Sequence, residues 1–280
     1  GEARRVRRIL TVFVLVSALG FGVPTAWRTV HRRLEGVRTG VTLEGRPMER
    51  YYEGEVRVVV EQMARQMQRP PRSAGIHKKT GAVVSHENGL YVDVDQTVYD
   101  VINAPAGAVL QISGIPIVPL LRTEHLEILT DLLGDFSTPV LGSPDRVSNI
   151  RLSLQAINNT LRLPGEVFSF HGIVGERTVE RGYKNAPIIV GEAVVPGVGG
   201  GVCQTSSTLY NAVREADLEI VERRIHSIAP SYIQHGRDAT VAWPHTDFKF
   251  RNNMETPIIV KAEIQKWRVR IWILGKKGGE

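Results

Sequence analysis

A glycine-rich segment that runs into a cysteine has the residue types best suited to chemistry. Residues 196–210 read PGVGGGVCQTSSTLY, and Cys203 is the single cysteine of the 280-residue chain. Three successive glycines allow backbone conformations closed to other residues and let a ligand approach closely. The helical pattern over residues 205–216 predicts a helix that starts near Cys203, where the helix dipole and unpaired amides favour thiolate and could hold an oxyanion. The segment indicates a reactive thiol, and a small buried cysteine is the alternative.

A cysteine nucleophile needs a base, usually a histidine that is oriented by a third group. The candidates among the eight histidines are His171, His226, His235 and His245. His226 ends a strand predicted over residues 218–226, which could return it alongside Cys203, and Asp238 precedes another predicted strand over 239–243. We therefore predict Cys203, His226 and Asp238 as the catalytic residues, with His171 as the competing base.

The residues around the thiol are predicted to bind the substrate. This set is Gly199, Gly200, Gly201, Gln204, Thr205 and Ser206. The sequence has no HxH or HExxH spacing, and one cysteine cannot build a thiolate zinc site. It also has no phosphate-binding or dinucleotide fingerprint, since VGGGVCQ matches neither spacing. No metal and no cofactor are predicted.

The net charge of +6 is local and does not describe the whole chain. Residues 1–38 contain eight arginines and two acids, so the remaining 242 residues are net neutral. A neutral body argues against nucleic acid as a partner.

These arginines flank the uncharged segment Ile9–Val23. With the residues up to Trp27 it reaches the roughly 20 apolar residues that a spanning helix needs. We expect a transmembrane helix at about 9–27, in contact with the lipid bilayer, within a basic anchor region 1–38. A cleaved signal peptide is the alternative. The expected location is the cell membrane, single-pass, with the C-terminal domains extracytoplasmic.

The expected fold class is α+β in three parts: the transmembrane helix, a small α+β module at 39–125, and a mixed α+β domain at 145–280. A linker rich in Gly, Ser and Pro is predicted at 126–144. Apolar residues spaced by three and four predict helices over 56–68 and 145–161, and residues 257–274 predict an antiparallel hairpin. The sheet of the last domain is expected to be mainly antiparallel.

The run from about residue 145 to residue 250 resembles the VanW family, named for an accessory protein of vancomycin-resistance gene clusters. The motifs that carry the resemblance are NIRLSLQAIN, PGEVFSF, VGERTVERGY, GGGVCQTSSTLYNA, ERRIHS, DATV and DFKFRN. Residues 39–125, with GVTLEG and ENGLYVDVDQT, resemble a domain thought to bind peptidoglycan that precedes VanW domains.

The resemblance implies a cell-envelope protein that acts on or binds peptidoglycan or its stem peptides. It does not supply a reaction, so two hypotheses stay open. One is a cysteine-dependent hydrolase or transpeptidase of stem peptides. The other is a non-catalytic peptidoglycan-binding or scaffold protein linked to the glycopeptide antibiotic response. A redox or metal role of the thiol is a weaker third possibility, and the oligomeric state is not predicted.

Overall fold

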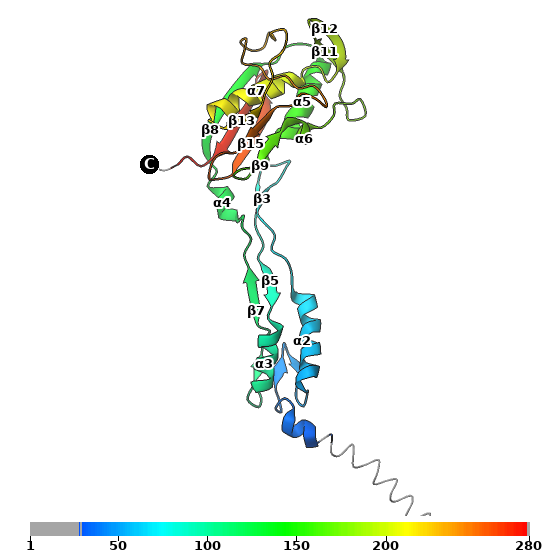
Figure 1. Cartoon of the computed structure of the whole chain (residues 1–280), viewed down its shortest axis with the longest axis vertical. Coiled ribbons are helices and arrows are strands. Elements are labelled where there is room, and N and C mark those ends of the chain that lie inside the picture. The colour runs from blue at the N-terminus through cyan, green and yellow to red at the C-terminus, as the bar shows by residue number, and fades with distance from the viewer. Residues whose placement is uncertain (1–27, 29, 279–280) are drawn as a thin grey trace, which may run out of the picture. The chain divides into compact units, whose positions relative to one another are not determined.

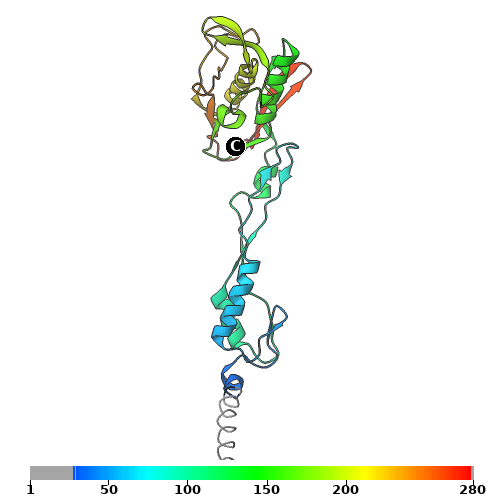
Figure 2. The ribbon, with the colours of Figure 1, turned by 90° about the vertical axis from the view of Figure 1, so that its right-hand side faces the viewer.

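The structure is a computed structural model that describes residue 28 and residues 30–278. The chain divides into two compact units, and each consists of two separate segments. The first unit is Gly1–Arg72 with Glu87–Pro119, and the second is Ser73–His86 with Leu120–Glu280. Figures 1 and 2 show the ribbon from two directions.

The first unit is a small α+β structure built around two helices, α2 (Glu53–Met67) and α3 (Val94–Asn103). The predicted periodicity over 56–68 is confirmed, because Val56 and Val60 are fully buried in the core of this unit. Its strands are β1 (Thr42–Leu43), β2 (Arg46–Pro47), β5 (Gly89–Val92), β6 (Val109–Leu110) and β7 (Gly114–Ile117). They form a three-stranded sheet β2-β1-β6 and an antiparallel pair β5-β7.

The second unit has an antiparallel sheet in the order β8-β16-β15-β9. Its strands are β8 (Asp131–Pro139), β9 (Thr160–Arg162), β15 (Ile258–Gln265) and β16 (Arg268–Gly275). Helices α5 (Pro144–Ile157) and α7 (Val202–Glu215) lie against this sheet (Figure 1). The predicted hairpin over 257–274 is confirmed as β15 and β16.

Smaller elements complete the second unit. They are β3 (Gly75–Ile76), β4 (Val83–Val84), α4 (Thr123–Glu127), β10 (Val167–Ser169), α6 (Phe170–Val174), β11 (Asn185–Val190), β12 (Ala193–Val198), β13 (Glu219–Glu222) and β14 (Lys249–Arg251). Strands β10, β14 and β13 form a second antiparallel sheet, and β11 and β12 form a hairpin just before the glycine segment.

Strand β8 lies within the region for which the sequence predicted a linker. It pairs along its whole length with β16. Gly134, which suggested a loop, is needed for packing: a Cβ there would lie 2.1 Å from the carbonyl oxygen of Ala212 in α7. Glycine marks close approach of the two backbones at this position.

Helix α7 is buried on almost every side. Its apolar residues Leu209, Ala212 and Val213 are fully buried, as the predicted periodicity requires. Its polar residues are buried as well, because hydroxyl groups on β8 and α5 bond to them: Thr138 to Thr208 at 2.8 Å and Ser153 to Thr205 at 2.7 Å. These bonds satisfy polar groups that would otherwise be costly to bury.

Two predicted strands are shorter or missing. The strand expected over 218–226 ends at Glu222, and residues 239–243 form no strand. Ala239 bonds to side chains of α7, with Ser206 donating to its carbonyl at 2.6 Å and its amide donating to Ser207 at 3.0 Å. These bonds fix the loop that carries Asp238 against α7, and His226 is bonded to Asp238 in turn.

The expected transmembrane helix at about 9–27 lies outside the described residues. Among residue 28 and residues 30–278, no helix has the length and apolar run that crossing a bilayer requires. This finding overturns the predicted fold class, which began with a spanning helix, and the predicted single-pass membrane location. The mixed α+β architecture with largely antiparallel sheets is what the structure supports.

Candidate active site

The N-terminus of α7 borders a cavity of about 430 Å³ in the second unit. Cys203 and His226 both line it, with Thr240 and Val241 from the loop that follows Asp238. β11 and the end of β12 also line the cavity and contribute aliphatic side chains such as Ile188. The cavity therefore combines a thiol, an imidazole and an apolar wall, as small-molecule and peptide sites do.

Each of the three glycines before Cys203 has a structural reason. Gly201 is the residue before the helix and has a φ of 105°, and Gly199 has a φ of 87°. Gly200 lies against β11, where a Cβ would meet the carbonyl oxygen of Ala186 at 2.4 Å. Left-handed backbone favours glycine, and close backbone approach requires it. The segment thus brings the chain tightly past β11 and into α7, and Gly199 and Gly201 line the cavity while Gly200 does not.

Asp238 holds the imidazole of His226 through a short, buried hydrogen bond. The Nδ1 atom of His226 lies 2.5 Å from Oδ2 of Asp238, and the backbone amide of His226 donates to the same oxygen at 2.6 Å. Asp238 is 2% exposed and His226 is 9% exposed. Since Nδ1 donates to the carboxylate, the other ring nitrogen, Nε2, is left for the thiol.

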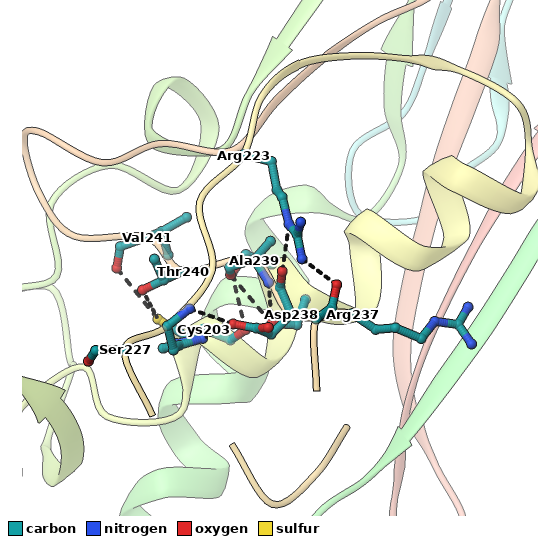
Figure 3. Close-up of polar contacts among 12 residues, drawn as sticks. Cys203, Arg223, Ser227, Arg237, Asp238, Ala239, Thr240 and Val241 are labelled. Carbon is teal, nitrogen blue, oxygen red and sulfur yellow. Dashed lines mark hydrogen bonds and ion pairs between the residues drawn. The ribbon is translucent and has the colours of Figure 1, made fainter. Parts of the chain in front are cut away.

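The loop that carries Asp238 is itself anchored by Arg223. Its Nε donates to the Asp238 carbonyl at 2.8 Å and its Nη2 donates to the Gly236 carbonyl at 2.6 Å. Figure 3 shows these bonds together with the start of α7. Arg223 also lies over the ring of Tyr210, with its Cζ 4.6 Å from the centroid. Arg223 thereby fixes the backbone on which the Asp238 carboxylate is mounted.

The Cys203 thiol lies beside a carbonyl, a hydroxyl and the cavity that His226 also lines. Its Sγ donates to the Val241 carbonyl at 3.5 Å and lies 3.8 Å from Oγ1 of Thr240 (Figure 3). Burial raises the pKa of Cys203, but interaction with His226, together with smaller contributions from its other neighbours, leaves that pKa below its ordinary value. Burial likewise lowers the pKa of His226, while Cys203 and Asp238 raise it to a net value above normal. Both directions favour a thiolate–imidazolium pair.

One backbone amide beside the thiol is available as a donor. At the start of α7, the amide of Val202 donates to Gly199 at 3.1 Å and that of Gln204 donates to Gly201 at 2.9 Å. Among the described residues, the amide of Cys203 has no acceptor. A free amide at a helix N-terminus suits a developing oxyanion.

The predicted substrate-binding residues of α7 have mainly structural contacts. Thr205 and Ser206 are fully buried, bonded to Ser153 and Ala239, and neither lines the cavity. Gln204 does line it, but its carboxamide is already occupied: it donates to the Pro139 carbonyl at 2.7 Å and accepts from Arg146 at 2.8 Å.

The competing histidines lie elsewhere. His171 is buried beside a separate hollow, where its Nδ1 accepts from Arg177 at 3.1 Å, and it does not line the cavity of Cys203. Burial lowers the pKa of His171. His235 and His245 are exposed, and neither lines that cavity. Within the described part of the chain, no group of three or more His, Cys, Asp or Glu side chains could hold a metal ion.

Two cavity residues of interest were missed from sequence. Arg146, on α5, lies with its Cζ 5.8 Å from the ring of Tyr232, and Arg177 comes from the loop after α6. Arg177 belongs to the motif VGERTVERGY, which was noted only as part of a resemblance. Nothing in local spacing relates either arginine to Cys203, because three separate segments meet only in the folded unit.

The comparisons with known proteins concern the second unit. Residues 145–274 match the family model described as VanW like protein. The uncharacterized protein YoaR of Bacillus subtilis is 45% identical over 156 residues, which is 55% of this chain and 52% of YoaR. The vancomycin B-type resistance protein VanW of Enterococcus faecalis is 29% identical over 116 residues, 40% of this chain and 42% of that protein.

These matches span about half the length of the two curated relatives. No solved structure is significantly similar to the chain. The resemblance of residues 39–125 to a peptidoglycan-binding domain stays a prediction. The glycine segment, Cys203, His226 and Asp238 all fall within the matched range. Residues 145–274 therefore form a VanW-like domain.

Proposed function

We propose that the VanW-like domain is a cysteine-dependent acyl-transfer enzyme that acts on peptide bonds of peptidoglycan stem peptides. The observation that carries this proposal is the arrangement of Cys203, His226 and Asp238, with the first two facing one cavity and the third bonded to His226 at 2.5 Å. The order thiol, imidazole, carboxylate is that of a nucleophile, a base and an orienting group.

The reaction begins with the Cys203 thiolate and the His226 imidazolium. The thiolate Sγ attacks the amide carbonyl carbon, and the oxyanion that forms accepts a hydrogen bond from the Cys203 amide. His226 Nε2 then gives its proton to the leaving nitrogen as the C–N bond breaks, which leaves a thioester. Water, or a second amine, attacks the thioester and gives a proton back to Nε2, and the product leaves Cys203 as thiolate.

The substrate class comes from the relatives and from the cavity. One relative is a vancomycin B-type resistance protein, which supports the cell wall as the setting. A cavity of about 430 Å³ with an aliphatic wall suits a short peptide with small side chains.

The test is digestion of purified muropeptides by the full chain, followed by mass spectrometry of the products. Cys203→Ser should abolish turnover, and His226→Gln should lower it by at least 100-fold because general acid–base catalysis contributes about 10²–10⁴-fold. His235→Gln is the matched control, since His235 is exposed and outside the cavity. It should leave turnover unchanged.

A non-catalytic scaffold would give a different pattern. Sacculi would bind the wild-type chain and the Cys203→Ser variant equally, and no muropeptide would change mass in either case. That pair of results would overturn the enzymatic proposal.

A further inference from the structure

Two partly buried arginines line the same cavity as Cys203 without a carboxylate partner. Arg146 donates to the Leu141 carbonyl at 2.6 Å and to Gln204 at 2.8 Å. Arg177 donates to His171 and to the Gly175 carbonyl, both at 3.1 Å. A guanidinium has five N–H donors, so each side chain keeps unused donors. Among the described residues, neither arginine forms an ion pair.

The glycine segment holds both arginines next to the nucleophile. A Cβ at Gly199 would lie 2.9 Å from Cβ of Arg177, and one at Gly201 would lie 2.8 Å from Cγ of Arg146. The two side-chain stems therefore pack against the same short loop, two and four residues before Cys203. Gly199 and Gly201 therefore leave room for the two arginine side chains and also allow the left-handed backbone of the turn.

The charges of the cavity leave the arginines uncompensated. Burial lowers the pKa of both guanidinium groups. Tyr232 and Cys203 oppose this effect for Arg146, and Cys203, Tyr183 and the more distant Asp247 oppose it for Arg177, but neither set offsets the burial. That thiolate is already paired with His226, and Asp238 is bonded behind the imidazole. Glu176 also lines the cavity but is exposed and bridges to neither arginine. Buried cations normally have an anionic partner, so a ligand can supply one here.

We propose that Arg146 and Arg177 form a carboxylate-binding subsite, so that the acyl substrate of Cys203 is an acidic peptide with a free carboxylate near the reacting carbonyl. This inference rests on the cysteine mechanism proposed above. Arginine suits the role because its planar fork matches a carboxylate with two parallel hydrogen bonds. The carboxylate belongs to the peptide C-terminus or to an acidic side chain, and both present the same group.

The first experiment measures alkylation of Cys203 by two reagents that differ in charge, iodoacetate and iodoacetamide. Every labelled thiol is Cys203, because the chain has one cysteine. Both reagents consume the same thiolate, so the ratio of their rates cancels changes in the thiolate pKa. Arg146→Gln and Arg177→Gln should each lower the iodoacetate-to-iodoacetamide ratio about tenfold, the value of one charge-assisted hydrogen bond. Arg151→Gln, an exposed arginine on α5, should leave it unchanged.

A second measurement uses the wild-type chain, in case the arginine variants fail to fold. N-acetyl-alanine should protect Cys203 from iodoacetamide, and N-acetyl-alaninamide, which lacks the carboxylate, should not. Equal protection by both, or unchanged rate ratios in two folded arginine variants, would overturn the subsite.

The two sources of the carboxylate separate in a peptide panel. If turnover is found and the subsite holds the peptide C-terminus, replacing that carboxylate by an amide should abolish turnover. If the subsite holds an acidic side chain, Glu→Gln in the peptide should abolish it instead. Turnover that survives both changes refutes the subsite but leaves the cysteine mechanism intact. An arginine-dependent preference of Cys203 for iodoacetate, without turnover of any peptide, supports the subsite and argues against the proposed acyl-transfer reaction.

Discussion

Replacing Asp238 by Asn tests how the site makes its thiolate. The carboxylate accepts two short bonds from His226, at 2.5 Å from Nδ1 and 2.6 Å from the backbone amide, and is 2% exposed. An opposite charge at this range moves a pKa by about 1–3 units. Asn keeps the shape but removes the charge, so we expect the pKa of His226 to fall by about 1–2 units, equivalent to ~1.4–3 kcal/mol.

The thiolate loses its imidazolium partner as a consequence. The pKa of Cys203 should rise by a similar amount, and the rate of alkylation below that pKa should fall about tenfold per unit. The assay is the rate of labelling by iodoacetamide between about pH 5 and 10, read by mass spectrometry of the single cysteine.

The matched control is Asp247→Asn. Asp247 is also a buried carboxylate beside a histidine, 5% exposed and bonded to the His171 amide at 2.9 Å, but it does not line the Cys203 cavity. The Asp247→Asn substitution should lower the free energy of unfolding and leave the pH profile of Cys203 labelling unchanged. A folded Asp238→Asn chain with the wild-type profile would refute the view that Asp238 acts through His226.

Three further predictions concern pH and packing. Since the pKa of Cys203 is lowered and that of His226 is raised, the pH dependence of turnover should be bell-shaped. Turnover should rise as Cys203 loses its proton and fall at higher pH as His226 loses its own. A rate that rises only near the ordinary thiol pKa of about 8.5 would contradict the thiolate–imidazolium pair. Gly134→Ala should lower the free energy of unfolding, measured by urea titration, by about 1–3 kcal/mol or more, because its Cβ would meet Ala212 in α7. Gly75→Ala is the control, since a Cβ there would have no other atom within 4 Å. Gly200→Ala should push β11 away and slow labelling of Cys203, and an unchanged labelling rate would show that the loop tolerates a side chain.

The elements of the second unit that could be predicted from sequence are those with a clear apolar period. Residues 145–161 gave a helix whose Ser143 cap and Pro144 start are both present, although the helix ends at Ile157. The hairpin β15–β16 was predictable because two runs rich in β-branched residues flank Gln265 and Lys266, and the buried residues of β16 alternate. Strand β8 was missed because its Gly134 signals a turn locally, whereas its role in packing against α7 is a tertiary effect.

The candidate site was predictable to the extent that its chemistry is carried by residue type. Cys203, His226 and Asp238 were chosen because a thiol needs a base and an orienting acid, and the structure brings these three together. Thr205 and Ser206 were predicted to bind the substrate, whereas the structure buries both away from the cavity. The sequence does not show which way a polar residue near a nucleophile faces. Arg146 and Arg177 were missed because a charged residue in a helix or loop is usually solvated.

The division of the chain into interleaved segments affects where a truncated VanW-like domain can be cut. The family match begins at residue 145, but the compact unit also includes Ser73–His86 and β8. Lys78, in the first of these segments, donates to the carbonyls of Ala156 and Asn158 at the end of α5, at 2.7 Å and 2.5 Å. A fragment cut at residue 145 would lose the edge strand of the sheet and this cap together. Recombination between relatives should therefore take Ser73–His86 and Leu120–Glu280 from the same parent. Glu87–Pro119 lies between these two segments and belongs to the first unit, so it should stay with Gly1–Arg72.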